Sequence, residues 1–524
     1  MTNTENRKLP VGIQSFVEIR RCGYLYVDKT EIMWKLVNGV KYNYLSRPRR
    51  FGKSVLVDTL KTYFEGRREL FEGLKIMQYE KEWKQYPVIR LDMSRGGASA
   101  ESVRSYFNTA FKGFEEKYGI VAAADDSLSV RFHNIIMAAY RQTNLQVVIL
   151  IDEYDAPLQH SWQTPEHEAC TALYREVFAI LKADDEFERF VFITGITKFT
   201  QISLFSVLNN LFNISFEPQF APICGITEDE ITANFMPEIE RMGKVNGWTV
   251  GEAHDKLKEY YDGYHFSRRN MVDIYNPFSL VNALNAEELR NFWAQSGATS
   301  LLPKFVDNME LRLEQFDNCY IDRDTLETSD VTGGGSELFL YQTGYLTIKS
   351  FDGDVYMLGF PNEEVKRALY RVVVPALTMR TNSDVVSTQS LLLKMMSDGN
   401  VAEAMKALKA IIADVPYSNK KLASMDMEER YRLIISTVFN AIGFQVEVEH
   451  MLSLGRIDII AKTSRYIYVL ELKLSNNGGM EAAARQIADH RYTEPFKADR
   501  RPVIALAIEL DSEGKGLLNW KQVE

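Results

Sequence analysis

Residues 42–57 constrain the fold of this chain more than any other stretch. A short apolar run leads into a polar, basic turn that closes with Gly52, Lys53 and Ser54, and an apolar helical pattern follows. Strand, turn and helix in this order are typical of a nucleotide-binding P-loop, in which backbone N–H groups and a helix N-terminus surround the phosphate oxygens. The lysine of such a loop reaches the outer phosphates, and the serine hydroxyl binds Mg²⁺. Lys53 and Ser54 are therefore the predicted ligands of a nucleotide and its Mg²⁺.

The turn departs from the full P-loop pattern at one position. Arg47 stands where the pattern has a glycine, so the loop must turn without the residue that normally permits it. The nucleotide-binding prediction therefore rests on Gly52 and the two residues that follow it. Two further cations, Arg49 and Arg50, are candidate phosphate ligands, in their own subunit or across a subunit contact. The alternative for both is an ordinary solvated loop charge.

A second motif supports the nucleotide site. Residues 147–151 are five consecutive apolar residues, mostly β-branched, and Asp152 and Glu153 follow them directly. Such a run predicts a strand that is buried on both faces, as in a parallel sheet. In P-loop NTPases a strand of this kind brings an Asp to the Mg²⁺ ion, and a following Glu can polarise the attacking water. The alternative is a buried strand that simply meets solvent at its end, but the upstream P-loop favours the catalytic interpretation.

A third buried strand is predicted over residues 190–197. Thr194, near its end, would lie between the P-loop and the Asp152 strand and could sense the terminal phosphate of the nucleotide. A Thr-rich strand end that caps the next helix is the alternative. Residues 221–226 are predicted as the last strand, and Thr227–Glu230 reads as a capping box. Strands that alternate with helices predict an α/β domain with a mostly parallel sheet.

Residues 227–410 show frequent helical patterns but no motif of known chemistry. Aromatic-rich turns occur at 260–266 and 275–278. Their rings, next to Arg268 and Arg269, could stack on nucleic-acid bases. Packing within a helical domain is the favoured interpretation.

The C-terminal part predicts a second site. Residues 455–461 and 466–474 read as strands, and each carries charged residues in an otherwise apolar run. Because side chains alternate along a strand, Glu471 and Lys473 point the same way, about 6.6 Å apart along the backbone. Asp458 would come from the neighbouring strand. Two carboxylates and a lysine that converge could hold Mg²⁺ and orient a water at a phosphodiester, and a surface sheet with polar faces is the alternative.

Composition sets limits on partners and location. A chain of 524 residues predicts two to four domains, and a net charge of −10 argues against a protein that binds nucleic acid over its whole surface. A local basic groove remains compatible with that charge. The four cysteines are scattered, which argues against structural zinc and a disulfide framework. No apolar run approaches the roughly 20 residues of a membrane span, so no membrane partner is expected and a reducing cytoplasm is the expected location.

The first set of motifs resembles a known family. Residues 46–54, with 26–30 upstream and 151–158 downstream, resemble the AAA-ATPase-like family, whose members are common in gut and anaerobic bacteria. An arginine in place of the first P-loop glycine is usual in that family, so Arg47 supports the resemblance. The resemblance implies ATP binding, Mg²⁺ and, as an expectation, ATP hydrolysis.

The C-terminal motifs resemble the PD-(D/E)XK nuclease superfamily domain that is often fused to this ATPase. In that superfamily the acids bind Mg²⁺ and the lysine positions or activates a water, which implies these roles for Asp458, Glu471 and Lys473. Glu428 lies where many members place an acid on the first helix, with Glu429 as a close competitor. Gln486 matches a polar position on the helix after the core strands. The proline of the superfamily's name is absent here.

The predicted architecture has three parts. These are an AAA-ATPase-like P-loop domain at residues 8–226, a mainly helical middle region at 227–410, and a PD-(D/E)XK nuclease-like domain of the restriction-endonuclease type at 415–524. The predicted function is an ATPase fused to a Mg²⁺-dependent nuclease that acts on nucleic acid, with DNA favoured and a homo-oligomer as one possible state. The alternative is an ATP-dependent regulatory switch or scaffold, whose C-terminal domain binds nucleic acid or protein without cleavage.

Overall fold

The computed structural model describes residues 8–197, 211–295, 302, 313–328, 335–378, 382–413, 415, 425–452 and 455–523. The chain divides into two compact units. The first comprises residues 1–293 and 318–362, and the second comprises residues 294–317 and 363–524. The division into three parts at 226 and 410 stays a prediction. Most of the glycine-rich loop at 331–336 lies outside the described residues.

The first unit is built on a five-stranded sheet in which neighbouring strands run parallel, in the order β2-β3-β4-β1-β5. The strands are β1 (Tyr42–Ser46), β2 (Val88–Asp92), β3 (Val147–Asp152), β4 (Glu188–Gly195) and β5 (Phe212–Asn213). All six residues of β3 are buried, as its uninterrupted apolar run predicts for a strand covered on both faces. The predicted α/β domain with a parallel sheet is confirmed.

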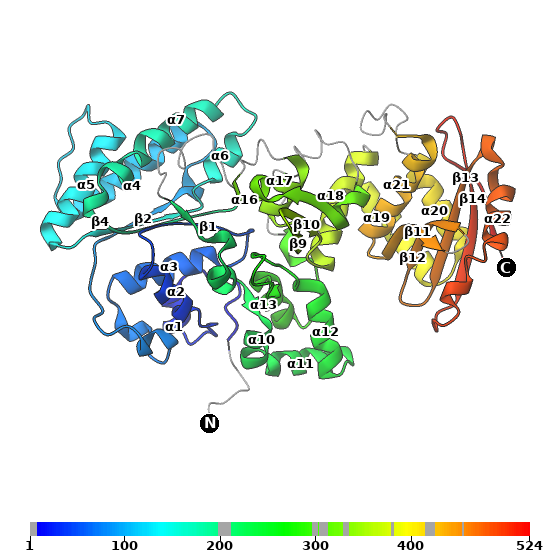
Figure 1. Cartoon of the computed structure of the whole chain (residues 1–524), viewed down its shortest axis with the longest axis horizontal. Coiled ribbons are helices and arrows are strands. Elements are labelled where there is room, and N and C mark those ends of the chain that lie inside the picture. Colours follow the sequence, from blue (N-terminus) through cyan, green and yellow to red (C-terminus); the bar gives the residue numbers. More distant parts are fainter. Residues whose placement is uncertain are drawn as a thin grey trace. The chain divides into compact units, whose positions relative to one another are not determined.

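Helices cover both faces of this sheet, with α1 to α3 on one face and α4, α5 and α7 on the other (Figure 1). The helices are α1 (Phe16–Arg21), α2 (Thr30–Val37), α3 (Lys53–Phe64), α4 (Ala100–Tyr118), α5 (Leu128–Thr143), α6 (Ala156–Ser161), α7 (His167–Phe178) and α8 (Ile180–Ala183). α4 begins with a capping box between Ser99 and Ser102, which satisfies two backbone donors at its start. The helices predicted over 54–66, 99–117 and 126–142 are confirmed to within two residues at each end.

The strand predicted at residues 221–226 is wrong. The first half of this stretch lies in a 3₁₀ helix, Pro218–Ile223, and the last strand of the sheet is β5. Pro218 and Pro222 have no backbone N–H to give to a sheet. The carbonyls of Phe220 and Ala221 instead accept hydrogen bonds from the side chain of Arg47.

The region after residue 226 is mainly helical, as predicted, but it also contains a small antiparallel sheet in the order β8-β10-β9. Its helices and strands are β6 (Ile226–Thr227), α10 (Glu228–Asn234), α11 (Met236–Asn246), α12 (Val250–Tyr261), β7 (Ile274–Tyr275), α13 (Pro277–Ala286), α14 (Phe292–Gln295), β8 (Cys319–Asp322), α16 (Arg323–Thr328), α17 (Gly335–Thr343), β9 (Thr347–Asp352) and β10 (Val355–Gly359). The predicted capping box at Thr227 and Glu230 is confirmed. Gly353 and Asp354 form the two-residue turn between β9 and β10, a typical hairpin signal, and Gly353 has a φ of +60°.

The second unit contains a five-stranded mixed sheet in the order β11-β12-β13-β14-β15, in which only β13 and β14 are parallel. Its helices and strands are α18 (Glu363–Thr378), α19 (Asn382–Ser397), α20 (Val401–Ala413), α21 (Met427–Ala441), β11 (Gln445–Leu452), β12 (Gly455–Lys462), β13 (Ile467–Leu474), α22 (Gly479–Asp489), β14 (Val503–Leu510) and β15 (Leu517–Val523). α22 lies on one face of this sheet, and α20 and α21 lie on the other (Figure 1). Within the described ranges, no helix combines the length and the apolar character that a membrane span needs.

Glu188 is a buried acid at the first position of β4, at the end of the sheet opposite the P-loop. Its Oε2 accepts a hydrogen bond of 2.6 Å from the hydroxyl of Tyr42. Its Oε1 is buried and finds no hydrogen-bond partner among the described residues. Burial, reinforced by the nearby acids Asp184 and Asp185, raises the pKa of Glu188 from its ordinary value of 4.5 to about 8.

We therefore expect the first unit to lose stability as the pH rises from about 4.5 towards 8. The folded state holds this proton more tightly than the unfolded chain, so the contribution is complete below pH 4.5 and is lost as the pH passes the folded pKa. Glu188→Gln should remove roughly 4 kcal/mol of this pH dependence. Urea unfolding at both pH values measures the effect, with the exposed neighbour in Glu186→Gln as the matched control. An unchanged pH dependence in Glu188→Gln would contradict the assignment.

Candidate functional site

The P-loop connects the end of β1 to the start of α3. Gly52 is the N-cap of α3 and has a φ of +87°, a conformation that favours glycine. Lys53 and Ser54 are the first two residues of the helix, so they lie where its free backbone N–H groups can face an anion. The strand, loop and helix predicted from this motif are confirmed.

Lys53 is buried and its ammonium group points back into the loop. Its Nζ donates to the carbonyl oxygens of Arg47 at 2.9 Å and of Pro48 at 3.0 Å. Burial lowers the pKa of Lys53, while the carboxylates of Glu153, Asp155 and Asp152 oppose that drop. The lysine of the loop and the acids at the end of β3 therefore belong to one electrostatic group.

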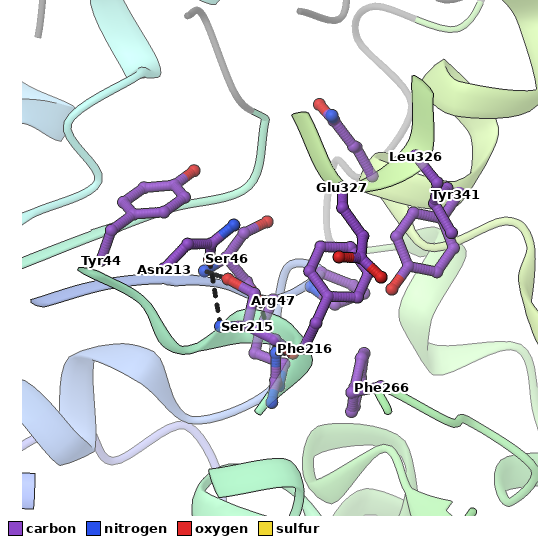
Figure 2. Close-up of a pocket in the computed structure, with 12 residues that line it drawn as sticks. Tyr44, Ser46, Arg47, Asn213, Ser215, Phe216, Phe266, Leu326, Glu327 and Tyr341 are labelled. Atoms are coloured by element: carbon purple, nitrogen blue, oxygen red, sulfur yellow. Dashed lines mark hydrogen bonds between the residues drawn. The ribbon is translucent and has the colours of Figure 1, made fainter. Parts of the chain in front are cut away.

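Arg47 explains how the loop turns without its first glycine. The guanidinium is buried and donates to the carbonyl oxygens of Ser46 at 2.8 Å and Ser215 at 2.9 Å. It also lies 4.0 Å from the centre of the Phe266 ring, and Figure 2 shows these groups around it. The side chain of Arg47 thus braces the loop against the segment after β5 instead of facing a phosphate.

The outer side of the loop packs against residues that lie more than 200 positions downstream. The Phe51 ring is 4.7 Å from the ring of Tyr264 and 5.4 Å from that of Phe266, which confirms packing as the role of these aromatic residues. The indole of Trp293 donates to the carbonyl of Arg49 at 3.3 Å. At Gly344 a Cβ would lie only 2.5 Å from the Cβ of Pro48. The region after residue 226 therefore holds the shape of the P-loop.

A pocket opens beside the loop, on the side of β5 (Figure 2). Ser46 and Arg47 form one wall, and Glu327 and Tyr341 lie opposite them. The ring of Phe216 stacks on that of Tyr341 with 6.1 Å between centres. The sheet order is β3-β4-β1-β5 in this part, so the acids at the end of β3 lie on the opposite side of β1 from β5 and the pocket.

The positions of Arg49 and Arg50 indicate a role in phosphate binding less clearly than the position of Lys53 does. An Nη of Arg49 lies 3.4 Å from Oε1 of Gln159. Arg50 is exposed, has a φ of +69°, and holds its guanidinium 4.7 Å from the centre of the Phe278 ring. Phosphate binding by these two residues stays a prediction.

Asp152, Glu153 and Thr194 come together at the carboxyl ends of β3 and β4. The sheet order places β4 between β1 and β3, as predicted for the strand that carries Thr194. The Thr194 hydroxyl donates to Oδ1 of Asp152 at 2.7 Å. Glu153 has a φ of +48°, which is rare for a residue other than glycine and is typical of functional sites. Burial raises the pKa of Glu153, and Lys53 opposes that shift.

Two residues of this site were missed by sequence reasoning. Arg90 on β2 bonds to Asp58 at 3.0 Å and lies 3.6 Å from Oδ2 of Asp152. Asp155 accepts from the backbone N–H of Thr197 at 2.6 Å and so ties the end of β4 to the turn after β3. A positive charge in the middle of the mostly apolar strand 88–92 was the available signal for Arg90.

The second site lies on β12, β13 and α21 of the second unit. Oδ2 of Asp458 accepts from the backbone N–H of Leu472 at 2.8 Å. The ammonium of Lys473 lies 3.1 Å from Oε1 of Glu471 and 3.9 Å from Oε1 of Glu428. The structure therefore brings together three acids and the lysine that were singled out in the sequence.

The acids of this cluster repel one another in a buried setting. Burial, with the charges of Asp458 and Glu428, raises the pKa of Glu471 to about 8. Burial also raises the pKa values of Asp458 and Glu428, and Lys473 opposes both shifts. A site with this much unfavourable negative charge would gain from a bound cation.

One oxygen of Glu471 marks where such a cation fits. Oε2 of Glu471 is buried, and no hydrogen-bond partner for it occurs in the described part of the chain. Among the described residues, no group of three or more His, Cys, Asp or Glu side chains has the geometry to hold a metal ion. Mg²⁺ commonly binds through one or two carboxylates and keeps several waters. Asp458 and Glu471 fit that mode, with Glu428 directed at Lys473.

Gln486 reaches this cluster only through a residue that sequence reasoning missed. Its Nε2 lies 2.9 Å from the hydroxyl of Tyr492, which donates to the carbonyl of Arg456 at 2.7 Å. Burial raises the pKa of Tyr492, and Glu471 and Asp458 add to that shift, so this hydroxyl belongs to the same electrostatic group. Tyr492 follows α22 in a polar stretch, where no pattern distinguishes it.

Comparison with known proteins matches a family model to each of the two regions that contain these residues. A family model described as predicted AAA-ATPase matches residues 10–205, and a model described as PD-(D/E)XK nuclease superfamily matches residues 426–520. An uncharacterized protein in the vnfD 5'region of Azotobacter chroococcum mcd 1 is 28% identical over 535 residues. The alignment covers 98% of this chain and 98% of that protein. The similarity therefore extends over nearly the whole length of both chains.

Proposed function

Because the chain joins an AAA-ATPase-like domain to a PD-(D/E)XK nuclease superfamily domain, we propose that it hydrolyses ATP at the first site and cleaves nucleic acid with Mg²⁺ at the second. The convergence of Asp458, Glu471 and Glu428 on Lys473 carries the proposal. A lysine among acids, one of which has a buried oxygen with no hydrogen-bond partner among the described residues, fits a metal-assisted phosphodiester hydrolysis.

At the first site each residue has one task. Gly52 and the start of α3 would give backbone N–H groups to the phosphates, and Lys53 would reach the outer phosphates. Ser54 and Asp152 offer the hard oxygen ligands that Mg²⁺ prefers. Glu153 would orient the attacking water, supported by its raised pKa and its place beside Lys53.

The surrounding residues complete this site. Thr194, held on Asp152, would sense the terminal phosphate because its strand lies between those of the P-loop and Asp152. Arg49 and Arg50 would add positive charge next to the phosphates, either in the same chain or across a contact in a homo-oligomer.

At the second site Asp458 and Glu471 would hold Mg²⁺, and Glu428 would be a further ligand or would hold Lys473 in place. Bound Mg²⁺ supplies Lewis-acid stabilisation of the charge that develops on the phosphate. Lys473, whose ammonium lies beside Glu471, would position the attacking water. Gln486 would support these groups through Tyr492. DNA is the favoured substrate, and ATP turnover in the cytoplasm would gate the cut.

The proposal is tested by incubating the full chain with ATP, Mg²⁺ and a panel of duplex DNA, single-stranded DNA and RNA. Phosphate release and strand cleavage are followed together, with and without EDTA. Cleavage that needs Mg²⁺ and is altered by ATP supports the proposal. Intact ATP turnover without cleavage of any strand contradicts the nuclease assignment and favours a regulatory switch.

For the first site, we expect Glu153→Gln to lower the rate of ATP hydrolysis by about 100-fold or more, which is typical for the loss of a general base. ATP binding should persist, because the amide keeps the size of the side chain and Lys53 and Ser54 are intact. Phosphate release and ATP-induced thermal stabilisation measure the two effects separately. Glu168→Gln, an exposed acid of α7, is the control, and unchanged turnover in Glu153→Gln would rule Glu153 out as the base.

A further inference from the structure

Two arginines share one acid at the edge of the second site. Oε1 of Glu449 lies 2.8 Å from an Nη of Arg456 and 3.2 Å from an Nη of Arg432. The other Nη of Arg432 lies 4.0 Å from Oδ1 of Asp458. The pair of guanidinium groups therefore lies directly beside an acid of the proposed metal site.

The backbone at Glu449 is in an unusual conformation. Its φ is +52° in the middle of β11, a region that side chains other than glycine rarely adopt. The ladder pairs Val448 with Ile459 and His450 with Ile457, so Glu449 stands opposite Asp458. Strain of this kind persists where the surroundings impose it, and it is concentrated at ligand sites and switch regions.

The chemistry of the two arginines suits a phosphate. A guanidinium is a planar fork that matches carboxylate and phosphate oxygens, and it keeps its charge when buried. Arg432 is buried, and its Nε is without a hydrogen-bond partner within the described ranges. The side chain of Arg456 is 48% exposed, so an incoming anion can reach it. Because residues two apart on a strand share a face, Arg456 and Asp458 open towards the same side of β12.

We propose that Arg432 and Arg456 form a binding site for a backbone phosphate of nucleic acid, and that the Glu449 carboxylate fills this site until nucleic acid arrives. The nature of the ligand rests on the proposed function, because a nuclease site next to Asp458 would receive a phosphodiester. The carboxylate of Glu449 presents two oxygens to the same donors that would hold two phosphate oxygens. When a phosphate displaces the Glu449 carboxylate, the arginines exchange one ion pair for another. The side chain of Glu449 is 38% exposed, so it can move into solvent.

A purely structural ion pair between α21, β11 and β12 is the competing explanation. In that case removing the Glu449 charge would leave the buried Arg432 and the half-exposed Arg456 without their acid and lower stability, with no gain in affinity for an anion. In a phosphate site the same change would remove a competitor and raise affinity. The two explanations therefore predict different directions for binding.

Binding is measured on the full chain with fluorescein-labelled duplex DNA of about 30 base pairs, in EDTA so that no strand is cut, over a series of salt concentrations. We expect Glu449→Gln to bind about fivefold tighter than the wild type at low salt. Glu447→Gln is the matched control, because it removes the same charge from the same strand but pairs with Lys462 and His450. We expect that control to stay within about twofold of the wild type.

Arg456→Gln tests the site from the other side. Since each phosphate contact adds about one to the slope of log affinity against log salt, this variant should bind several-fold more weakly and lose about one unit of slope. Its exposed position makes misfolding a smaller concern than at Arg432. Equal affinities of Glu449→Gln and Glu447→Gln, unchanged binding by Arg456→Gln, or no binding by any variant would overturn the proposal. The expected shifts without cleavage in Mg²⁺ would instead leave the phosphate site standing and contradict the nuclease activity.

Discussion

Lys53→Ala is expected to lower kcat/KM for ATP by at least about 100-fold, because it removes the charge that a phosphate-binding loop directs at the transferred group. The ammonium is held by the carbonyl oxygens of Arg47 and Pro48 and faces the acids at the end of β3. Without it, the negative charges of Asp152 and Glu153 would repel the nucleotide phosphates. The variant should therefore also lose most of the thermal stabilisation that ATP gives to the wild type.

The control for this experiment is Lys61→Ala, on the same helix. Lys61 forms a surface pair with Glu65 at 2.7 Å, and its side chain is 35% exposed, so its loss should cost little. Because Lys53 is buried, Lys53→Met serves as a second variant that keeps the apolar volume of the side chain. Wild-type turnover in either variant at position 53 would remove the P-loop from the mechanism.

Lys473→Ala is expected to abolish at least about 99% of strand cleavage and to leave ATP turnover unchanged, because the two sites lie in separate units. Lys473 is the cation nearest to Glu471, at 3.1 Å, and it opposes the rise in the pKa values of Glu471 and Asp458. Without it these acids hold their protons to higher pH. The residual activity should then need a more alkaline medium than the wild type does.

The rate of duplex cleavage as a function of pH, in Mg²⁺, checks this expectation. The matched control is Lys462→Ala, a lysine of the neighbouring strand that pairs with Glu447 at 2.5 Å and is similarly buried. Equal cleavage by Lys473→Ala and Lys462→Ala would show that Lys473 is a structural residue. A lower rate with an unshifted pH profile would separate a role in orienting water from the effect on the acids.

Most of the sheet that carries the first site could be predicted from the sequence, because each strand leaves a local signal. β1 and β3 are apolar runs that end in charged or polar turns. A parallel strand that is buried on both faces usually has such a continuous apolar sequence. The polar groups at their ends could be assigned because parallel strands bring their carboxyl ends to one edge. The same reasoning worked at Asp458 and Glu471, where charges interrupt apolar strands.

What could not be predicted depends on contacts between distant segments. Arg47 is a deviation in the motif, and only its bonds to Ser215 and Phe220 reveal it as a brace. Tyr492 and Arg432 lie in stretches without a distinguishing sequence pattern. Their roles become apparent only from the acids that lie near them in the structure. The stretch 221–226 has the apolar residues of a strand. Pro222, together with Pro218 just before the stretch, and the hydrogen bonds that Arg47 donates to the carbonyls of Phe220 and Ala221 favour a 3₁₀ helix instead.

The packing around Phe51 has a practical consequence for dissecting the protein. A fragment that stops near residue 226 would keep every motif of the ATP site but would leave Phe51 without Tyr264 and Phe266, and Pro48 without Gly344. Its loop would then expose apolar surface and lose the neighbours that define its shape. A fragment that ends at residue 362, where the first compact unit ends, retains these contacts. The nucleotide-binding motif is therefore much shorter than the segment of chain whose contacts hold it in shape.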